Sequence, residues 1–444
     1  MERLTLRLGA LLAILSLANI PALAGTDGDG VADATDNCIC VSNPLQEDDD
    51  GDGRGNVCDN CPNPPDVNPS QRDSDADGIG KVCDASPFKI DTGYGPIPGT
   101  STGSIPTGAA NNELLAWHIF TLHVPGSSDV ALPPGTGNSY LFSVFDTGST
   151  YVVLNPGDAN FLNDPGGALD VNIWGFSAVD PGSTRCNPIR FPEAEDTSVN
   201  LFRETDNTIP TLIGGALMNQ VIAWIDYTTI VQRIYTFGTF RFPLITFFEA
   251  GDPGIPTPLF WAEIQGTGIP STPSPQGADR GERFLINNMT FKNGSASVTS
   301  PANSTVMPPP GQRFLYDTGN TATQIGRNLA TALGIDWTTL PAGNPTIVRR
   351  INGVPTGLNG YYIEKVEIEA ADGSYAYVIN SPLVFVFPSA TMGGVDANVG
   401  SNYFEKTQVV FDGPGNRIGL FKGVQQQPPG PPSNPTSLRI HDID

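Results

Sequence analysis

The stretch Leu141-Phe142-Ser143-Val144-Phe145-Asp146-Thr147-Gly148-Ser149 decides the fold, and Arg313-Phe314-Leu315-Tyr316-Asp317-Thr318-Gly319-Asn320 is its counterpart. In each copy an apolar, strand-like run leads into Asp-Thr-Gly, so a carboxylate stands at the tip of a strand. The two aspartates are far enough apart in the chain for each to belong to its own lobe of one larger unit. Two such strand tips can bring two carboxylates face to face. Because like charges that close cannot both ionise, the pair shares one proton, and one group can act as base while the other acts as acid.

Each copy of the motif is followed by a second shared feature, an apolar segment that ends in glycine. Leu212-Ile213-Gly214 follows Asp146 after a long excursion, and Asn398-Val399-Gly400 follows Asp317 after a similar one. A strand that ends in aspartate then follows in both halves, at 221–226 and at 409–412. The repeated series predicts an internal duplication with a period near half the domain.

Further motifs in the second half support a family resemblance. They are Phe284–Gly294, Asn398–Phe404, Thr407–Asp412 and Asn416–Leu420. With the two Asp-Thr-Gly copies, they make residues 113–423 resemble the pepsin-like aspartic endopeptidases. The resemblance implies a mostly β, bilobal pepsin-like acid protease fold, with lobes at about 113–270 and 271–423 and the cleft between them. A short helix is expected after the second motif, at about Arg327 to Leu333.

The resemblance also implies a role for the residues of both motifs. Asp146 and Asp317 would be the catalytic pair at the floor of the cleft. Thr147 and Thr318 would cross-link the two motif loops, and Ser149 would hydrogen-bond the outer oxygen of Asp146. The supporting residues implied in this way are Thr147, Gly148, Ser149, Thr318, Gly319 and Asn320.

The chain departs from the family at three places. Asn320 stands where the family has Thr or Ser, and its amide could still donate to Asp317. Val153 stands where the family has a Trp, and the expected flap stretch, Phe176 to Phe191, contains no Tyr. The departure at Asn320 concerns the tuning of the aspartate pair, and the other two concern substrate clamping more than the hydrolytic chemistry.

An acidic module precedes this domain. Residues 26–84 carry fifteen acidic residues against three basic ones, and the pattern that begins at Asp48 recurs from Asp73. Counted from Asp48, side-chain oxygens fall at loop positions 1, 3, 5, 9 and 12 with glycine at position 6, which is the spacing of an EF-hand-type calcium loop. Lys81 takes position 9 in the next copy, where a water or a poorer ligand set is expected. The predicted Ca²⁺ ligands are Asp27, Asp29, Asp33 and Asp36 in a partial first copy, Asp48, Asp50, Asp52, Asn56 and Asp59 in the second, and Asp73, Asp75, Asp77 and Asp84 in the third.

This module resembles thrombospondin type 3 repeats, of which Asp36-Asn37-Cys38 and Asp59-Asn60-Cys61 are markers. A disordered acidic tail would lack the phased cysteines and glycines. The repeat pattern implies the disulfides Cys38–Cys58 and Cys61–Cys83, and these with calcium must hold loops that have almost no apolar core. Cys40 and Cys186 are left over and could pair, but six cysteines allow fifteen connectivities.

The remaining segments complete the domain plan. Residues 1–24 are predicted to be a secretory signal peptide, with Arg3 and Arg7 before an apolar core and Ala22-Leu23-Ala24 as the cleavage site. The repeats then span 25–86, a linker 87–112, the protease-like domain 113–423, and a Pro-rich tail 424–444. His118 and His123 are expected to be half-buried strand residues rather than zinc ligands.

Composition limits the partners. With a net charge of −23, nucleic acid is a poor partner, and no later run is long enough for a membrane span. We therefore expect a secreted, extracellular or periplasmic aspartic endopeptidase with structural Ca²⁺ in its repeats and none needed for catalysis. Its partner would be a peptide or protein substrate, with a cell-surface or matrix partner possible through the calcium module. The alternative is a calcium-dependent surface or adhesion protein whose protease-like domain only binds.

Overall fold

The computed structural model describes residues 26–67, 79–80, 82–83, 113–123, 141–162, 164, 166–174, 193–206, 209–235, 238–248, 251, 254–269, 272–302, 307–351 and 354–425. The described residues up to Cys83 and those from Glu113 onward belong to two compact units. The predicted signal peptide, the linker, the flap stretch and the tail beyond Gln425 lie outside the described residues, as do Asp73, Asp75, Asp77, Asp84 and Cys186.

The first unit is built of turns and loops. Disulfides join Cys38 to Cys58 and Cys61 to Cys83, which confirms both predicted pairs. Gly53, the glycine at loop position 6, has φ of 97°, a left-handed conformation that glycine adopts at little cost. The described part of this unit therefore has the tight, cross-linked loops that the sequence pattern predicts.

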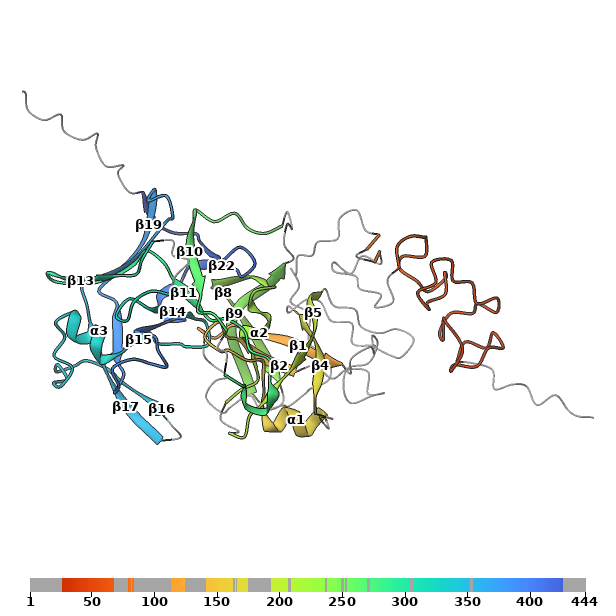
Figure 1. Ribbon diagram of the computed structural model, residues 1–444, viewed down its shortest axis with the longest axis horizontal. Helices are drawn as coiled ribbons and strands as arrows, with labels where there is room; N and C mark the ends of the chain where they lie inside the picture. The colour runs from red at the N-terminus through yellow and green to blue at the C-terminus, as the bar shows by residue number, and fades with distance from the viewer. Residues whose placement is uncertain are drawn as a thin grey trace, which may run out of the picture. The chain divides into compact units, whose positions relative to one another are not determined.

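The first lobe of the second unit contains a seven-stranded sheet in the order β5-β4-β1-β2-β7-β3-β6. Figure 1 labels β1, β2, β4 and β5 of this sheet. Strand β2 ends at the first motif and pairs in parallel with β7, with Phe145 opposite Ile213. The elements of this lobe are β1 (Trp117–His123), β2 (Leu141–Phe145), β3 (Val153–Leu154), α1 (Pro156–Leu162), β4 (Ala168–Trp174), β5 (Glu193–Asn200), β6 (Phe202–Arg203), β7 (Leu212–Ile213) and α2 (Gly215–Met218).

The second lobe repeats the central pairing. Strand β14 carries the second motif and pairs in parallel with β21, with Asp317 opposite Gly400. Helix α3 (Arg327–Ala332), capped by Leu333, confirms the predicted helix. The other elements are η1 (Pro275–Gly277), β11 (Phe284–Ile286), β12 (Met289–Asn293), β13 (Ala296–Thr299), β14 (Phe314–Asp317), β15 (Gln324–Ile325), β16 (Thr346–Ile351), β17 (Val354–Tyr362), β18 (Lys365–Glu369), β19 (Tyr375–Asn380), β20 (Leu383–Val386), β21 (Ala397–Gly400), η2 (Ser401–Phe404) and β24 (Val424–Gln425).

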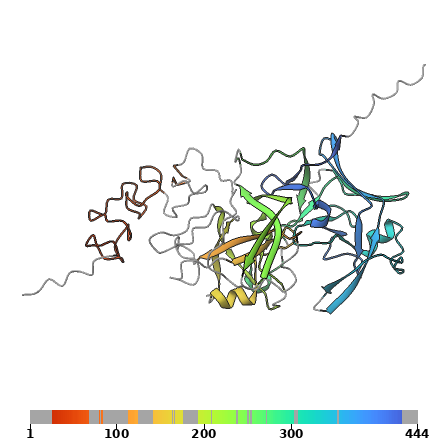
Figure 2. The same cartoon turned by 180° about the vertical axis from the view of Figure 1, so that it is seen from behind.

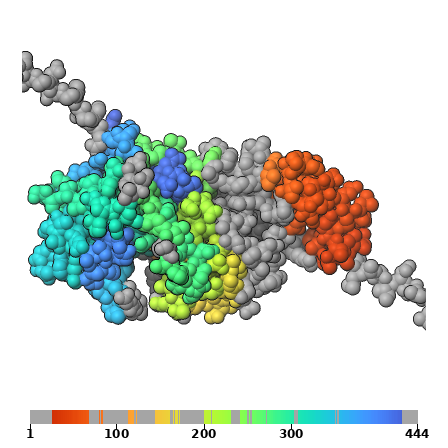
Figure 3. Space-filling view, viewed as in Figure 1, coloured from red at the N-terminus to blue at the C-terminus, as the bar shows by residue number. Residues whose placement is uncertain are grey.

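One sheet of twelve strands runs through both lobes, in the order β16-β17-β20-β15-β21-β14-β11-β10-β23-β22-β8-β9. Toward one end of this order β22 pairs antiparallel with β8. Strand β22 ends at Asp412 as predicted, whereas β8 continues past Asp226 to Tyr235, so the predicted strand end at Asp226 was wrong. Figure 2 shows the long strands of the first-lobe side from behind, and Figure 3 shows the surfaces of the first lobe in yellow to green and the second in teal to blue. The additional strands are β8 (Ile222–Tyr235), β9 (Gly238–Phe248), β10 (Phe260–Gly266), β22 (Gln408–Asp412) and β23 (Arg417–Leu420).

This topology confirms a mostly β, two-lobed fold built from a duplicated unit. A third sheet, β13-β12-β18-β19-β24, covers the second lobe and extends through Gln425, slightly past the predicted end of the domain. Among the described residues, no helix is both long and apolar enough to cross a membrane.

Aromatic side chains support the strands that carry the motifs. Phe411 of β22 contacts Phe145, Phe284 and Tyr316, with ring centroids 5.8, 5.2 and 6.2 Å apart. All four residues are fully buried. Since large buried rings dominate core energetics, this cluster fixes the two strand tips relative to one another.

Candidate active site

The two aspartates that the sequence singled out lie together. Their carboxylates share a hydrogen bond, and each lies against the glycine of the opposite motif. A Cβ on Gly148 would be 2.4 Å from Cγ of Asp317, and a Cβ on Gly319 would be 2.3 Å from Cγ of Asp146. Real Cβ atoms do not approach carbon atoms that closely, so the glycine of each Asp-Thr-Gly makes room for the other aspartate.

The two threonines cross-link the motif loops. The backbone N–H of Thr147 donates to Oγ1 of Thr318 and that of Thr318 donates to Oγ1 of Thr147, both at 3.1 Å. Their hydroxyls donate across the lobes, from Thr147 to the Tyr316 carbonyl at 2.8 Å and from Thr318 to the Phe145 carbonyl at 2.6 Å. Four buried groups are thereby paired, and a lost partner would cost about 1–3 kcal/mol each. The network has the arrangement that the resemblance implied.

The glycines of the later apolar segments lie behind the motif loops. A Cβ on Gly214 would meet the Tyr151 carbonyl oxygen at 2.3 Å, and one on Gly400 would meet the Asn320 carbonyl oxygen at 2.6 Å. The same close approach in both lobes explains why the repeated series needs glycine at this point.

Each aspartate has its own hydrogen-bond partners. Oδ1 of Asp146 accepts from the N–H groups of Gly148 at 2.8 Å and Ser149 at 3.1 Å. The side chain of Asn398 and the backbone of Gly319 lie near Asp317 and act to lower its pKa, against the larger effect of burial. Asn398 belongs to the apolar-Gly segment of the second lobe, and the sequence did not mark its side chain as part of the site.

Two side chains of the motifs differ from what the resemblance implied. The Ser149 hydroxyl donates to the Tyr151 carbonyl at 2.9 Å, so the residue contacts Asp146 through its backbone N–H. Asn320 accepts through Oδ1 from the N–H of Ala322 at 3.2 Å, while its Nδ2 is buried without a partner among the described residues. The expected donation to Asp317 is therefore replaced by a local turn, because the Asn side chain bonds its own loop.

The surroundings of the two carboxyls shift their pKa values by different amounts. Burial raises the pKa of Asp317 well above its usual range, and the charge and hydrogen bond of Asp146 raise it further. Burial also raises the pKa of Asp146, but the hydrogen bonds from Asp317, Gly148 and Ser149 act in the opposite direction. This asymmetry favours a proton on Asp317 and a negative charge on Asp146.

Two arginines that the sequence analysis missed interact electrostatically with the carboxyls. Arg283, just before β11, donates through Nη2 to the Gly393 carbonyl at 3.4 Å, and its charge lowers the pKa of Asp146. Arg349, in β16, donates through Nη2 to Oγ1 of Thr321 at 3.3 Å and interacts electrostatically with Asp317. Neither belongs to an Asp-Thr-Gly motif or to its repeated series, so the duplication in the sequence does not point to them.

The first lobe carries an aromatic residue near the site. Tyr151 stacks on Phe202 at 5.2 Å between ring centroids, and its hydroxyl accepts from Nε of Arg280 at 2.9 Å. Val153, at the position where the family has Trp, is buried in β3.

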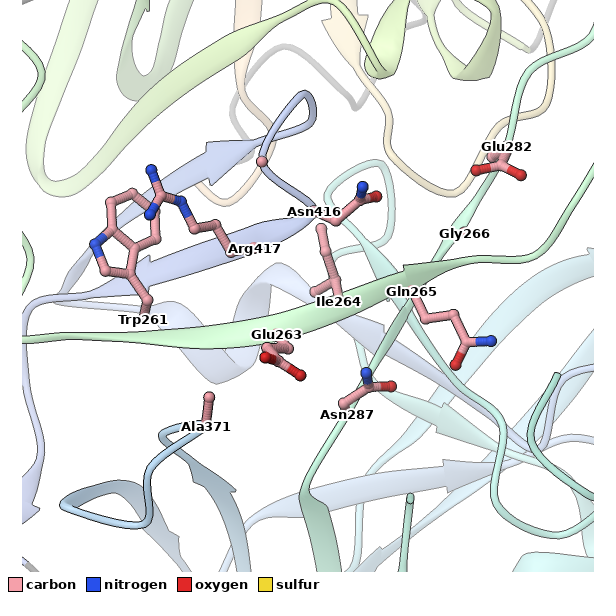
Figure 4. A pocket seen from close by; sticks show the side chains of 11 residues that line it. Trp261, Glu263, Ile264, Gln265, Gly266, Glu282, Asn287, Ala371, Asn416 and Arg417 are labelled. Atoms are coloured by element: carbon pink, nitrogen blue, oxygen red, sulfur yellow. The ribbon is translucent and has the colours of Figure 1, made fainter. Parts of the chain in front are cut away.

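The described cavity lies elsewhere. A polar cavity of about 570 Å³ is lined by β10 and the β22–β23 turn, as Figure 4 shows, and no residue of either Asp-Thr-Gly motif lies in its wall. Arg417 stacks on Trp261 with its Cζ 4.0 Å from the ring centroid. The amide oxygens of Gln265 and Asn287, which have no hydrogen-bond partner among the described residues, line the cavity. This cavity is separate from the paired carboxylates.

Two acidic clusters lie in the first unit. The carboxylates of Asp27, Asp29 and Asp36 lie within 4.8 Å of one another, and so do those of Asp48, Asp50 and Asp52. In Asp27, Asp36 and Asp50, the Oδ2 atom is buried and has no hydrogen-bond partner among the described residues. Carboxylate oxygens without donors are the ligands that Ca²⁺ prefers, so these six residues fit the ion.

The other predicted ligands differ. Asp33 accepts from the N–H and hydroxyl of Thr26 at 2.7 and 2.8 Å, and Oδ1 of Asn56 accepts from the N–H of Asp49 at 2.9 Å. Asp59 lies close enough for its charge to raise the pKa of Asp50, after the larger effect of burial. Asp33 is thus engaged in a local turn, whereas Asp59 stays near the second cluster.

Comparison with known proteins finds a family model that matches part of the first unit. The family model of the thrombospondin type 3 repeat matches residues 25–46 and 39–69. No curated protein matches the chain. Among solved structures, the chain is similar to basic 7S globulin from soybean, at 10% identity over 69% of this chain and 97% of that one with a TM-score of 0.34. It is also similar to an aspartic proteinase from Irpex lacteus, at 13% identity over 71% of this chain and 96% of that one with a TM-score of 0.32.

Proposed function

We propose that the second unit is an aspartic endopeptidase. The observation that carries the proposal is the reciprocal placement of Asp146 and Asp317, each against the glycine of the other motif and joined by a hydrogen bond. A merely structural duplication would not need the buried carboxyl of Asp317 in contact with the partly buried one of Asp146, because burying a charge is costly. Perturbed carboxyl pairs of this kind are typical of acid–base sites.

The protonation pattern suggests how the pair works. Asp146, the more readily ionised group, takes a proton from a water held between the carboxyls, and that water attacks the peptide carbonyl carbon. Asp317 gives its proton to the carbonyl oxygen, forming a tetrahedral diol. On breakdown of the diol, Asp146 gives its proton to the leaving amine as the C–N bond breaks, and Asp317 takes a proton from a diol hydroxyl as the carbonyl re-forms, so the pair returns to its starting protonation state. Because both steps need one shared proton, the rate should be highest in acid and fall once both carboxyls ionise.

We further propose that the first unit binds at least two Ca²⁺ ions as structural cofactors, through the clusters at Asp27, Asp29 and Asp36 and at Asp48, Asp50 and Asp52. The ion would neutralise carboxylates that otherwise repel one another in loops with little apolar core. The disulfides of the first unit and its match to an extracellular type of repeat support a location outside the cytoplasm.

The test is digestion of a denatured protein between pH 3 and 6, with calcium present, with and without pepstatin. The wild type should cleave in a pepstatin-sensitive manner. Asp146→Asn and Asp317→Asn should each lower the rate by at least about 10²–10⁴-fold, since each removes one partner of the acid–base pair. Circular dichroism of both variants checks that the fold is kept.

The competing function is a calcium-dependent surface or adhesion protein with a non-catalytic second unit, and the repeats in the first unit do not by themselves distinguish it from a protease. Under that hypothesis neither asparagine variant would change the behaviour of the protein. Wild-type protein that shows no pepstatin-sensitive cleavage with calcium bound would establish the binding function instead.

A further inference from the structure

The charge beside the paired carboxylates is positive. With one proton shared, Asp146 and Asp317 carry a single negative charge, whereas Arg283 and Arg349 carry two positive charges. Among the described residues, neither arginine forms an ion pair with another carboxylate. The neighbouring Glu282 lines the separate cavity of Figure 4 and lies against Gly266. This local excess is unusual in a chain with 46 acidic and 23 basic residues.

Unused donors accompany this charge. Nε of Arg283 and Nδ2 of Asn320 are both buried and have no hydrogen-bond partner among the described residues. The orientation of the Asn320 amide is fixed, because its Oδ1 accepts from the N–H of Ala322 at 3.2 Å and from Nη2 of Arg349 at 3.5 Å. Buried donors without acceptors are uncommon in folded proteins, and a substrate can supply the acceptors.

Arg349 is placed to meet a peptide chain. It lies in the hairpin formed by β16 and β17, opposite Thr356, and is half-buried on the side that contacts Thr321. Its neighbour Val348 is 66% exposed, and Val354 across the hairpin is 61% exposed. The guanidinium of Arg349 therefore extends from an exposed apolar hairpin to the second motif loop. Among the described residues, it donates there only to neutral oxygens.

We propose that Arg349, with Arg283, selects peptides that present a carboxylate next to the bond to be cut. This proposal rests on the function proposed above. A planar guanidinium binds a carboxylate through two parallel hydrogen bonds, and such charge-assisted bonds are stronger than neutral ones. The carboxylate would belong to an Asp or Glu side chain or to the end of the substrate chain, since both present the same group.

The experiment compares matched peptides that differ only by Glu or Gln beside the cut, each with a free or an amidated C-terminus. Values of kcat/KM are measured at pH 5.5, where a Glu side chain is ionised. The wild type should prefer Glu, or the free C-terminus, by about 10-fold or more. Arg349→Gln should abolish that preference and Arg349→Lys should keep part of it, while Arg283→Gln should reduce it.

Arg327→Gln is the matched control. Arg327 lies in α3 and stacks on Trp337 with its Cζ 4.4 Å from the ring centroid, whereas Arg349 donates to Thr321 and Asn320 of the second motif loop. The loss of Arg327 should therefore leave the preference intact. If the arginines only tuned the acidity of the carboxyls, their loss would shift the pH profile equally for both peptides. Equal cleavage of the Glu and Gln peptides and of the free and amidated forms by the wild type would overturn the proposal while leaving the protease function intact.

Binding separates the two proposals if no peptide is cleaved. Fluorescence anisotropy with the same peptides, labelled, is measured on the wild type, on Asp146→Asn and on the double variant that adds Arg349→Gln. Tighter binding of the carboxylate peptide that is lost with Arg349 would support selection by a non-hydrolytic protein. Equal binding of both peptides would refute the selection.

Discussion

Replacing His118 by glutamine should make the second unit more resistant to acid. His118 is fully buried in β1, with Nε2 2.8 Å from Oγ of Ser143 and its ring 5.2 Å from that of Phe247. Burial lowers its pKa from 6.5 to about 3, because the cationic form would lose its hydration. The imidazole thus stays neutral in the folded chain well into the acidic range.

The sign and size of the effect follow from proton linkage. Below pH 6.5 the unfolded chain binds a proton at this histidine and the folded chain does not, so the free energy of unfolding falls as the pH falls. The loss begins near pH 6.5 and is complete near pH 3, where the folded histidine also protonates. At about 1.36 kcal/mol per pH unit, the loss is roughly 3 kcal/mol at pH 4 and about 5 kcal/mol in full. That is a large share of the roughly 5–15 kcal/mol that stabilises a typical domain.

Glutamine can keep a hydrogen bond to Ser143 but does not titrate. The assay is urea unfolding of the full chain at pH 7, 6, 5 and 4, followed by tryptophan fluorescence, since all five tryptophans lie in the second unit. We expect His118→Gln to be somewhat less stable than the wild type at pH 7 and to gain on it by roughly 3 kcal/mol by pH 4. A difference between the two proteins that stays constant from pH 7 to pH 4 would refute the reasoning.

Three further predictions concern the paired carboxyls and the calcium loops. Gly148→Ala should lower peptidase activity by about 10²-fold or more, because its Cβ would displace the Asp317 carboxyl. Gly357→Ala is the control, since a Cβ added at Gly357 would meet no atom within 4 Å. Asp317→Asn should raise the melting temperature at pH 7 but not at pH 3.5. The reason is that a folded-state pKa raised above the unfolded value removes stability as the pH rises. An equal gain in melting temperature at both pH values would contradict this. Calorimetry should detect at least two Ca²⁺ sites, and chelation should increase hydrogen exchange at residues 26–67; no binding heat and unchanged exchange would exclude calcium-dependent order.

Local patterns in the sequence were sufficient for several features. The two Asp-Thr-Gly copies and their later glycines predicted the duplicated, mostly β fold, because strand tips and glycine-dependent close approaches are properties of short segments. The spacing of the acidic residues predicted the clusters at Asp27 and Asp48, and the resemblance to the calcium repeats implied the two described disulfides. The helix at Arg327 was also predicted, with nearly the same end.

The tertiary structure decided what depends on distant partners. The sequence could not show that Asn320 turns toward Ala322 and Arg349, that the Ser149 hydroxyl bonds Tyr151, or that His118 is fully rather than half buried. It also gave no sign that Arg283 and Arg349 lie beside the carboxyls, since the two arginines come from separate parts of the second lobe. Charge interactions depend on distance in space, whereas the spacing of motifs in the sequence reports only on residues that are neighbours along a strand or a turn. The sequence therefore specified the two aspartates, and only the packing of the second lobe brought two positively charged arginines within electrostatic range of them.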